Sequence, residues 1–288
     1  MNPLKRIAAI NDLSGLGKCS LTVALPIISA SGVECSVIPT ALLSTHTGVF
    51  KNWTLTDLTD NILPIAKHWN EVGASFDGIF TGYLASPQQG EIVSDAIDLL
   101  KGEDTIIIVD PAMADNGRYY SNLDSGMSEC FRSLIKKANV ITPNFTEACF
   151  LAGVDYVEGT VSEDYIDMIM DRLLDLGPET VVVTGVSVKK DSIGTFLKNR
   201  KHNKLHEIVA HEKTGMFHGA GDVFASSLSA LLIRGADETD AVQMAMEFTS
   251  ECIERTENRG TPRHYGLDFE SALLNYILQL NKYFCTSD

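Results

Sequence analysis

Continuous apolar runs alternate with longer stretches of helical periodicity along most of this chain. The runs are short, rich in Val, Ile and Thr, and end in polar or turn residues; they cover residues 7–11, 33–42, 78–81, 105–109, 140–142 and 180–184. Continuous rather than alternating runs are typical of strands that are covered on both faces. They predict the strands of a buried, mainly parallel sheet.

The helical stretches lie between these strands, where parallel neighbours need crossover connections. Their periodicity predicts helices within residues 20–30, 57–72, 88–101, 126–137, 162–176, 222–234, 238–255 and 269–280. Residues 192–197 and 206–210 predict an antiparallel pair near one edge of the sheet, and residues 44–55 a flap or rim loop. Without an internal repeat or a Gly-, Ser- or Pro-rich linker, residues 1–288 are expected to form a single α/β domain, its central sheet flanked by helices.

Composition and charge narrow the class of partner. The 288 residues are 44% hydrophobic, and 23 basic against 38 acidic residues give a formal charge of −15. Such an acidic surface repels nucleic acid and anionic membranes, so neither is an expected partner. The N-terminus shows no signal-peptide pattern, and the six cysteines form no C-x-x-C pair. We therefore expect a cytoplasmic protein with buried free thiols and no structural metal.

The sharpest local signal is Gly219-Ala220-Gly221-Asp222, directly before an apolar helix. Glycines at a helix start let backbone N–H groups point at an anion, and the helix dipole adds positive potential there. A carboxylate in that first turn can accept a proton from a substrate hydroxyl while the amides neutralise a transferring phosphoryl group. Taken alone, the four residues favour the simpler interpretation that Asp222 only caps the helix.

A second signal is the set of polar side chains at the ends of predicted strands. Asp110 follows residues 105–109, Asn144 and Glu147 follow residues 140–142, and Thr184 ends residues 180–184. Ligands of open α/β sheets bind beyond the carboxyl ends of the strands, and gathered carboxylates suit Mg²⁺. Each residue alone is more simply a turn or cap residue, but their coincidence at successive strand ends favours a binding site.

Some motifs do not carry the chemistry that they suggest. Gly15-Leu16-Gly17-Lys18 resembles the end of a P-loop, but Asp12 and Cys19 stand where Gly and Ser or Thr are needed. We therefore expect Lys18 to be a solvated helix residue, whereas the turn containing Asp12 could still hold substrate. His46 and His218 are each expected to be ordinary hydrogen-bonded histidines.

As an ordered set, these motifs resemble the ribokinase-like kinases, and among them the pyridoxal (vitamin B6) kinases. Residues 219–222 match the G-A-G-D motif of that family, and residues 144–147 its N-x-x-E. Residues 109–115 resemble the V-D-P-V-M-G-D segment of the pyridoxal kinases, and residues 44–48 resemble their S-N-H-T-G segment. Gly82-Tyr83 matches a Gly-Tyr pair of the same kinases. The similarity covers nearly the whole chain.

The resemblance implies a ribokinase-like three-layer sandwich, a homodimer, and transfer of a phosphoryl group from Mg-ATP to the 5′-hydroxymethyl group of pyridoxal, pyridoxine or pyridoxamine. It makes Asp222 the catalytic base and the amides of Gly219, Ala220 and Gly221 the anion hole. It places Asp110 and Glu147 at Mg²⁺, and assigns the acceptor ring and ATP to the following side chains: Asp12, His46, Thr47 and Tyr83 for the ring; Asp110, Asp115, Thr142, Asn144, Glu147 and Thr184 for ATP. A requirement for a monovalent cation is left open.

Two alternatives remain. Asp12-Leu13-Ser14-Gly15 resembles the D-x-S-G turn of hydroxymethylpyrimidine kinases, which perform the same chemistry on another heterocycle. A non-catalytic B6-binding protein of the same fold is the other, although intact Asp222 and Glu147 argue against it. An oxidoreductase is excluded by the lack of a dinucleotide fingerprint, and a sugar kinase is disfavoured because the early Gly-Gly motif of ribokinases is absent.

Overall fold

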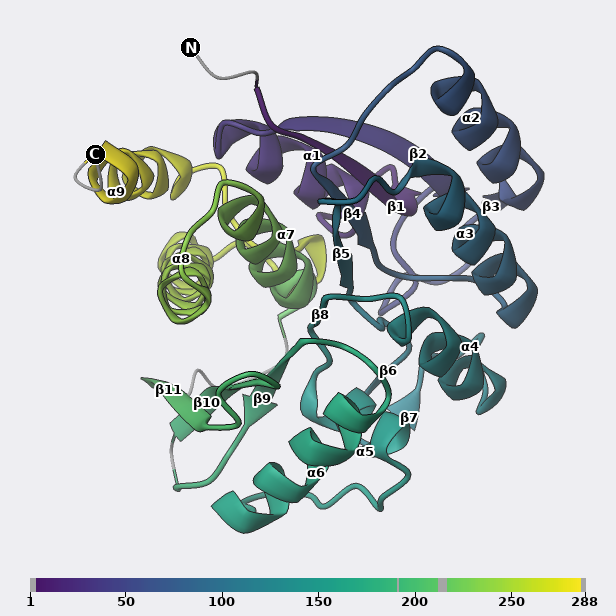
Figure 1. Cartoon of the computed structure of the whole chain (residues 1–288). Helices are drawn as coiled ribbons and strands as arrows, with labels where there is room; N and C mark the ends of the chain where they lie inside the picture. Colours follow the sequence, from purple (N-terminus) through teal and green to yellow (C-terminus); the bar gives the residue numbers. More distant parts are fainter. Residues whose placement is uncertain (1–3, 191, 212–216, 286–288) are drawn as a thin grey trace.

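A nine-stranded sheet runs through the computed structural model, which describes residues 4–190, 192–211 and 217–285 (Figure 1). Its strand order is β11-β10-β9-β8-β5-β4-β1-β2-β3. The bounds are β1 (Arg6–Ser14), β2 (Glu34–Leu43), β3 (Leu55–Asp57), β4 (Gly78–Thr81), β5 (Ile106–Val109), β8 (Val140–Ile141), β9 (Thr180–Val186), β10 (Ser192–Asn199) and β11 (Leu205–His211). Neighbours from β2 to β9 are parallel, whereas β3, β10 and β11 are antiparallel to their neighbours. The predicted parallel sheet and its antiparallel edge pair are confirmed.

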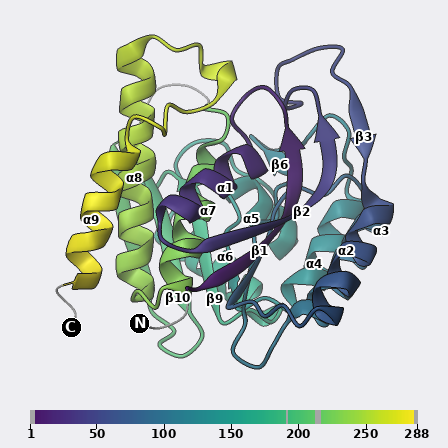
Figure 2. The same ribbon diagram turned by 90° about the horizontal axis from the view of Figure 1, so that it is seen from above.

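Helices cover both faces of this sheet. One layer contains α1 (Leu21–Ala30), α7 (Ala220–Ile233), α8 (Glu238–Arg259) and α9 (Leu273–Cys285). The other contains α2 (Thr59–Glu71), α3 (Pro87–Leu100), α4 (Gly126–Ile135), α5 (Phe145–Ala152) and α6 (Glu163–Asp175). Figure 2 shows α7, α8 and α9 on one side of β1 and β2, and α2, α3 and α4 on the other. The chain therefore has the three-layer α/β architecture expected from its sequence.

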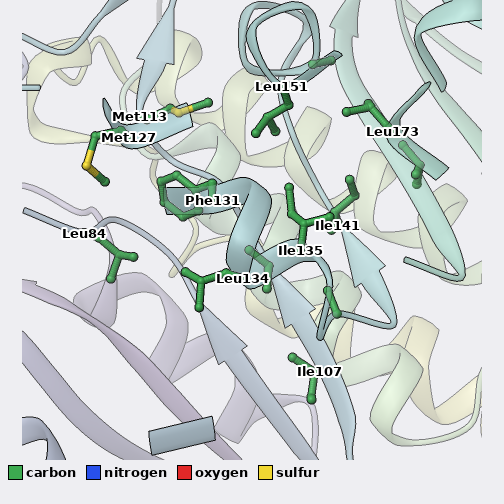
Figure 3. Packing of buried hydrophobic residues seen from close by; sticks show 14 of the residues in the cluster. Leu84, Ile107, Met113, Met127, Phe131, Leu134, Ile135, Ile141, Leu151 and Leu173 are labelled. Atoms are coloured by element: carbon green, nitrogen blue, oxygen red, sulfur yellow. The ribbon is translucent and has the colours of Figure 1, made fainter. Parts of the chain in front are cut away.

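Two apolar cores lie on the two faces because side chains alternate along each strand. In β5, Ile107 and Val109 belong to the core under α2–α6, whereas Ile108 belongs to the core under α1 and α7–α9. Figure 3 shows Ile135 of α4 beside Ile141 of the sheet, in the same core as Phe131 and Ile107. A strand that is buried on both sides can be apolar at every position, which explains its continuous run in the sequence.

Several local elements differ from the sequence prediction. Helix α5 was not predicted, because its eight residues follow so closely on β8. A small hairpin of β6 (Ala114–Asp115) and β7 (Arg118–Tyr119) also went unpredicted. The rim loop is shorter than residues 44–55 at its far end, where β3 begins, and α9 begins four residues later than expected.

Two smaller expectations need correction. Lys18 is not in a helix; it precedes α1, and its Nζ forms an ion pair with Glu270 at 2.7 Å. All six cysteines are free, but only Cys149 and Cys252 are buried, and Cys285 is exposed. Within the described ranges, no helix is both long and apolar enough to cross a membrane.

Candidate active site

The polar residues singled out in the sequence converge beyond the carboxyl ends of the parallel strands. Asp12 lies near the end of β1, Asp110 directly follows β5, and Thr142 directly follows β8. Asp222 reaches the same place from the first turn of α7. This is the edge at which open α/β sheets bind ligands, because the strand ends and helix N-termini meet there.

A glycine nest opens α7. Gly219 has φ 78° and ψ 1°, a left-handed conformation that glycine adopts without strain. No side chain caps this helix start, although the Ala220 amide donates to the Phe217 carbonyl oxygen at 3.4 Å. A Cβ on Gly219 would lie 2.2 Å from the Lys18 carbonyl oxygen, so glycine is required for packing as well. The result is an anion-binding concavity beside Asp222.

The Asp222 carboxyl has a strongly perturbed pKa. Burial raises this pKa to about 7, and the negative charge of Asp12 acts in the same direction. A hydrogen bond from the Ser20 backbone amide opposes the shift. A carboxylate with a pKa near neutrality is well matched to accept a proton from an alcohol during the reaction.

Asp110 is the second buried carboxyl of the site. The Thr142 hydroxyl donates a hydrogen bond of 3.2 Å to its Oδ1. Burial and then the charge of Asp222 hold the Asp110 pKa well above its usual value. The unrelieved repulsion between these two carboxyls marks a place where a cation would be favourable.

Glu147 holds the start of α5 against the segment after β5. Its Oε2 accepts from the Asn144 amide at 2.9 Å, and its Oε1 from the amides of Met113 and Ala114 at 3.0 and 3.3 Å. Asn144 completes the capping box, because its Oδ1 accepts from the Glu147 amide at 3.0 Å. Burial and the charge of Asp110 nevertheless keep the Glu147 pKa well above normal.

The chemistry of these oxygens fits a hydrated magnesium ion. Asp110 has one oxygen without a side-chain partner, whereas both Glu147 oxygens already accept backbone hydrogen bonds. Mg²⁺ prefers oxygen ligands and keeps several waters, so contact through water suits Glu147. Among the described residues, no three His, Cys, Asp or Glu side chains form a preassembled metal cluster.

The β6–β7 hairpin adds Asp115 and a tyrosine that the sequence reading missed. Asn116 and Gly117, with φ 49° and 73°, form the two-residue turn, and Gly117 donates to Thr146 Oγ1 at 3.0 Å. The Tyr120 pKa is raised well above normal, first by burial and then by Glu147, Asp115, Asp110 and Asp222. The charges of these carboxylates therefore act on its hydroxyl. The Asn-Gly pair was the available sequence signal, since it predicts a hairpin that returns the chain to this place.

Asp12 and Tyr83 form the opposite side of the site. Asp12 is 4% exposed and accepts from the Ser14 hydroxyl at 3.2 Å. Burial raises its pKa, and hydrogen bonds from Ser20 and Ser14 oppose that shift. The pKa of Tyr83 is raised by burial and, to a smaller extent, by Asp12, while its hydroxyl accepts from Asn122 Nδ2.

Two histidines join the rim loop to the glycine nest. The rings of His46 and His218 stack with centroids 4.9 Å apart, a contact that the sequence analysis did not predict for His218. Gly48 N–H donates to His46 Nδ1 at 3.2 Å, and His46 Nε2 lies 2.6 Å from the His264 carbonyl oxygen. This pattern fits a neutral imidazole protonated at Nε2, and burial lowers the pKa of both stacked rings.

Thr47 and Thr184 lie at the border of the site. Thr47 lies in the turn between His46 and Gly48 and is half-buried. Thr184 pairs with Asn144 in an isolated parallel bridge, its amide donating to Pro143 O at 3.0 Å. Both positions border the site, but within the described part of the chain no hydrogen bond joins either hydroxyl to the carboxylates.

Comparison with known proteins identifies the group to which this site belongs. Residues 27–266 match the phosphomethylpyrimidine kinase family, which is most of the chain. The chain belongs to the phosphomethylpyrimidine kinase family. It is accordingly a kinase with the ribokinase-like fold.

Solved structures and curated relatives extend this family assignment. A Bacteroides thetaiotaomicron protein, provisionally assigned as a phosphomethylpyrimidine kinase, is 36% identical with a TM-score of 0.91, over 95% of this chain and 94% of that one. A second crystal form of it contains pyridoxal. Pyridoxal kinase from Lactobacillus plantarum is 27% identical with a TM-score of 0.88, over 98% and 99% of the two chains. A pyridoxal kinase of Rubrobacter xylanophilus is 24% identical over 88% of each chain.

Proposed function

We propose that this chain is a pyridoxal kinase that transfers the γ-phosphoryl group of ATP to the 5′-hydroxymethyl group of vitamin B6. The observation that carries the proposal is the meeting of Asp222, beside the nest of Gly219 to Gly221, with the buried carboxyls Asp110 and Asp12. A kinase needs a base at the acceptor hydroxyl and positive potential at the transferred group. The related protein bound to pyridoxal supports the choice of acceptor.

In this mechanism Asp222 accepts the proton of the acceptor hydroxyl as the oxygen attacks phosphorus. The amides of Gly219, Ala220 and Gly221 face the charge that develops on the phosphoryl oxygens. Because these amides are fixed before substrate binds, little reorganisation accompanies the reaction. Catalysis then consists mainly of alignment and neutralisation of charge.

The nucleotide side of the site is assigned to the residues that follow β5 and β8. Asp110, and Glu147 through water, would hold Mg²⁺, which when bound neutralises the phosphate charge. The following side chains would lie near the ATP phosphates: Asp115, Thr142, Asn144 and Thr184. Asp115 is half-buried, and burial raises its pKa, so a cation or a hydrogen-bond donor is favoured beside it.

The ring side is assigned to Asp12, Thr47, Tyr83 and His46. Asp12 and Tyr83 interact electrostatically, and His46 is packed against the nest through His218. Their position near Asp222 would place the ring so that its hydroxymethyl group reaches the base.

Phosphorylation of hydroxymethylpyrimidine is the second candidate. Asp12 is the observation that favours it, because a buried carboxylate can accept hydrogen bonds from an amino-substituted ring. An ADP-release assay with Mg-ATP and pyridoxal, pyridoxine, pyridoxamine or hydroxymethylpyrimidine separates the two. Turnover of the B6 vitamers supports the first function, whereas turnover of the pyrimidine alone replaces it with the second.

A homodimer and a cytoplasmic location are also proposed. Four exposed apolar side chains near the β2–β3 edge support self-association: Leu16, Leu42, Val49 and Leu55. Light scattering should give a mass of twice the 31.4 kDa chain. The net charge of −15 and the six free cysteines support a reducing, cytoplasmic environment.

A further inference from the structure

Two side chains at the start of α5 hold the base of the β6–β7 hairpin. Glu147 Oε1 accepts from the amides of Met113 and Ala114 at 3.0 and 3.3 Å. Asn144 Nδ2 donates to the Ala114 carbonyl oxygen at 2.8 Å. These hydrogen bonds reach the segment before the hairpin and its first residue, so the position of the two-residue turn depends on other contacts.

Thr146 of α5 contacts that turn. The Gly117 amide donates to Thr146 Oγ1 at 3.0 Å, and Thr146 is only 2% exposed. Within the described ranges, no other hydrogen bond joins Asn116 or Gly117 to a residue outside the hairpin. Gly117 also lies so close to Tyr156 that a Cβ would be 2.7 Å from Cδ1 of that ring. The turn is therefore held by the Thr146 hydroxyl and the Tyr156 ring.

The formation of α5 does not explain a threonine at position 146. Threonine is β-branched, which lowers its helix propensity. The helix start is already capped by the reciprocal hydrogen bonds of Asn144 and Glu147. A valine of nearly the same shape would fill the buried space without a hydroxyl that needs a partner. The hydroxyl is therefore explained by its contact with the hairpin.

The turn in its place holds the Asp115 carboxylate. Asp115 Oδ1 accepts from the Asn116 amide at 2.8 Å, and Asp115 Oδ2 accepts from Asn116 Nδ2 at 3.0 Å. Both carboxylate oxygens are thus bonded to the residue directly before Gly117. A displacement of the turn would carry the carboxylate with it.

We propose that Thr146 is a positioning residue that acts through the Asn116-Gly117 turn to hold the Asp115 carboxylate for the binding of Mg-ATP. The inference rests on the proposed function, which assigns Asp115 to the neighbourhood of the ATP phosphates. A carboxylate there favours binding only where it faces a cation or a hydrogen-bond donor, because elsewhere it repels the phosphates. Its position therefore affects the affinity for the nucleotide, whereas the acceptor binds on the other side of the site.

The test compares two substitutions of Thr146 with the wild type. Thr146→Val removes the acceptor of the Gly117 amide and keeps the shape of the side chain, whereas Thr146→Ser keeps the hydroxyl. Thr146→Val should raise the KM for Mg-ATP about fivefold, the scale of one lost hydrogen bond. Its kcat and its KM for pyridoxal should stay within about twofold of the wild type, as should all three constants of Thr146→Ser. A Thr146→Ser enzyme with the same high KM for Mg-ATP as Thr146→Val would overturn the inference.

Thr105→Val is the matched control. Thr105 is also buried, and its Oγ1 accepts from the Gly102 amide at 2.9 Å and donates to the Phe76 carbonyl oxygen at 2.7 Å. It directly precedes β5, at the opposite edge of the sheet from the site. Thr105→Val should lower the Tm at least as much as Thr146→Val does, because it also loses a buried hydroxyl, but it should leave the KM for Mg-ATP unchanged. An equal rise of that KM in both valine variants would mean that it follows from lost stability, and would overturn the inference.

A double substitution tests whether Thr146 acts through Asp115. In an Asp115→Asn background, Thr146→Val should raise the KM for Mg-ATP no further, because the two residues belong to one chain of contacts. Two full effects that add would contradict this route. If Thr146→Val does not fold, Asn116→Gly replaces it, since glycine keeps the φ of 49° and removes only the contact of an exposed side chain with Asp115. An unchanged KM for Mg-ATP in Asn116→Gly would also overturn the inference.

Calorimetric titration with Mg-AMP-PCP separates this inference from the proposed function, because it needs no acceptor. A wild-type enzyme that phosphorylates no B6 vitamer contradicts the pyridoxal kinase proposal. Binding of Mg-AMP-PCP that is about fivefold weaker in Thr146→Val, but not in Thr105→Val, still supports the positioning role in that case. Equal dissociation constants in the wild type and Thr146→Val contradict the positioning role even where pyridoxal is phosphorylated.

Discussion

Asp222 lies in the first turn of a helix, where the dipole ordinarily favours a charged carboxylate, yet its pKa is about 7. Burial outweighs the dipole, and the charge of Asp12 adds to the shift. The same residue can thus hold a proton near neutrality, which a simple helix cap has no need to do. At the residue scale, this perturbation is the observation that most favours the proposed role of Asp222 as a base over a role as a helix cap.

The pH dependence of activity follows from that pKa. Below about pH 7 the base is increasingly protonated, so kcat/KM for pyridoxal should rise about tenfold per pH unit up to that point and level off above it. Steady-state rates measured between pH 5.5 and 8.5 would show this rise of kcat/KM with pH and the plateau above it. A profile that is flat across pH 7 would contradict the assignment of Asp222 as the base.

Removal of the base should slow turnover without unfolding the protein. Asp222→Ala is expected to lower kcat at least about a hundredfold, the usual scale for loss of a general base. Its Tm should not fall, because the variant also removes a buried, mutually repelling carboxyl. Near-normal turnover by a folded Asp222→Ala enzyme would show that another group takes the proton.

At the scale of elements, α5 illustrates how one side chain fixes a binding surface. Glu147 joins the helix start to the segment after β5 through three backbone amides. It therefore holds Asp110 and the hairpin with Asp115 in register with β8. The backbone contacts that give Glu147 its structural role also hold it in place for its proposed role at the metal.

Glu147→Gln should separate nucleotide binding from ring binding. A glutamine can accept with one oxygen only and places an amino group against amide donors, so stability should fall by about 1–3 kcal/mol. The KM for Mg-ATP should rise far more than the dissociation constant for pyridoxal, measured by titration. An equal loss of affinity for Mg-ATP and for pyridoxal would indicate that the whole site is disrupted.

The rim loop is held to the nest by the stack of His46 on His218, and Gly48 makes this close approach possible. A Cβ on Gly48 would lie 2.6 Å from His218 Cε1. Gly48→Ala should therefore displace the stack and raise the KM for pyridoxal about fivefold to tenfold, within the usual cost of overpacking. Gly102→Ala, in the α3–β5 turn, is the control, since its Cβ would make only ordinary contact at 3.5 Å. Equal kinetics in the two variants would argue against the stack.

At the scale of the whole molecule, the charge of −15 opposes the binding of an anionic nucleotide. The mutually repelling Asp110, Glu147 and Asp222 add to this at the site. Binding of ATP must therefore depend on local neutralisation by the glycine nest and by a divalent cation. The glycine nest is part of the fold, and Asp110 and Glu147 are the proposed ligands of the cation.

Chelation tests this balance. Excess EDTA should abolish turnover and weaken ATP binding, and added Mg²⁺ should restore both, because the carboxylates otherwise repel the phosphates. Pyridoxal binding, followed by its absorbance, should change little. Full activity in EDTA would remove the assigned role of Asp110 and Glu147.

Much of this protein could be predicted from local sequence. The continuous runs gave the strands, because a strand covered on both faces requires apolar residues throughout. The Gly219–Asp222 motif and the polar residues after β5 and β8 predicted where the proposed site lies, because parallel strands place all their carboxyl ends at one edge. These features depend on short-range patterns and on a topology with few alternatives.

Other features were decided only by the tertiary structure. The environments of Tyr120 and His218 depend on residues far away in the chain, and nothing in their own neighbourhood distinguishes them from ordinary loop residues. The pKa of Asp222 likewise depends on burial and on Asp12, some two hundred residues earlier. Sequence periodicity reports which face of an element is buried, whereas electrostatics and backbone strain arise from the three-dimensional meeting of segments, and that meeting forms only when the chain is folded.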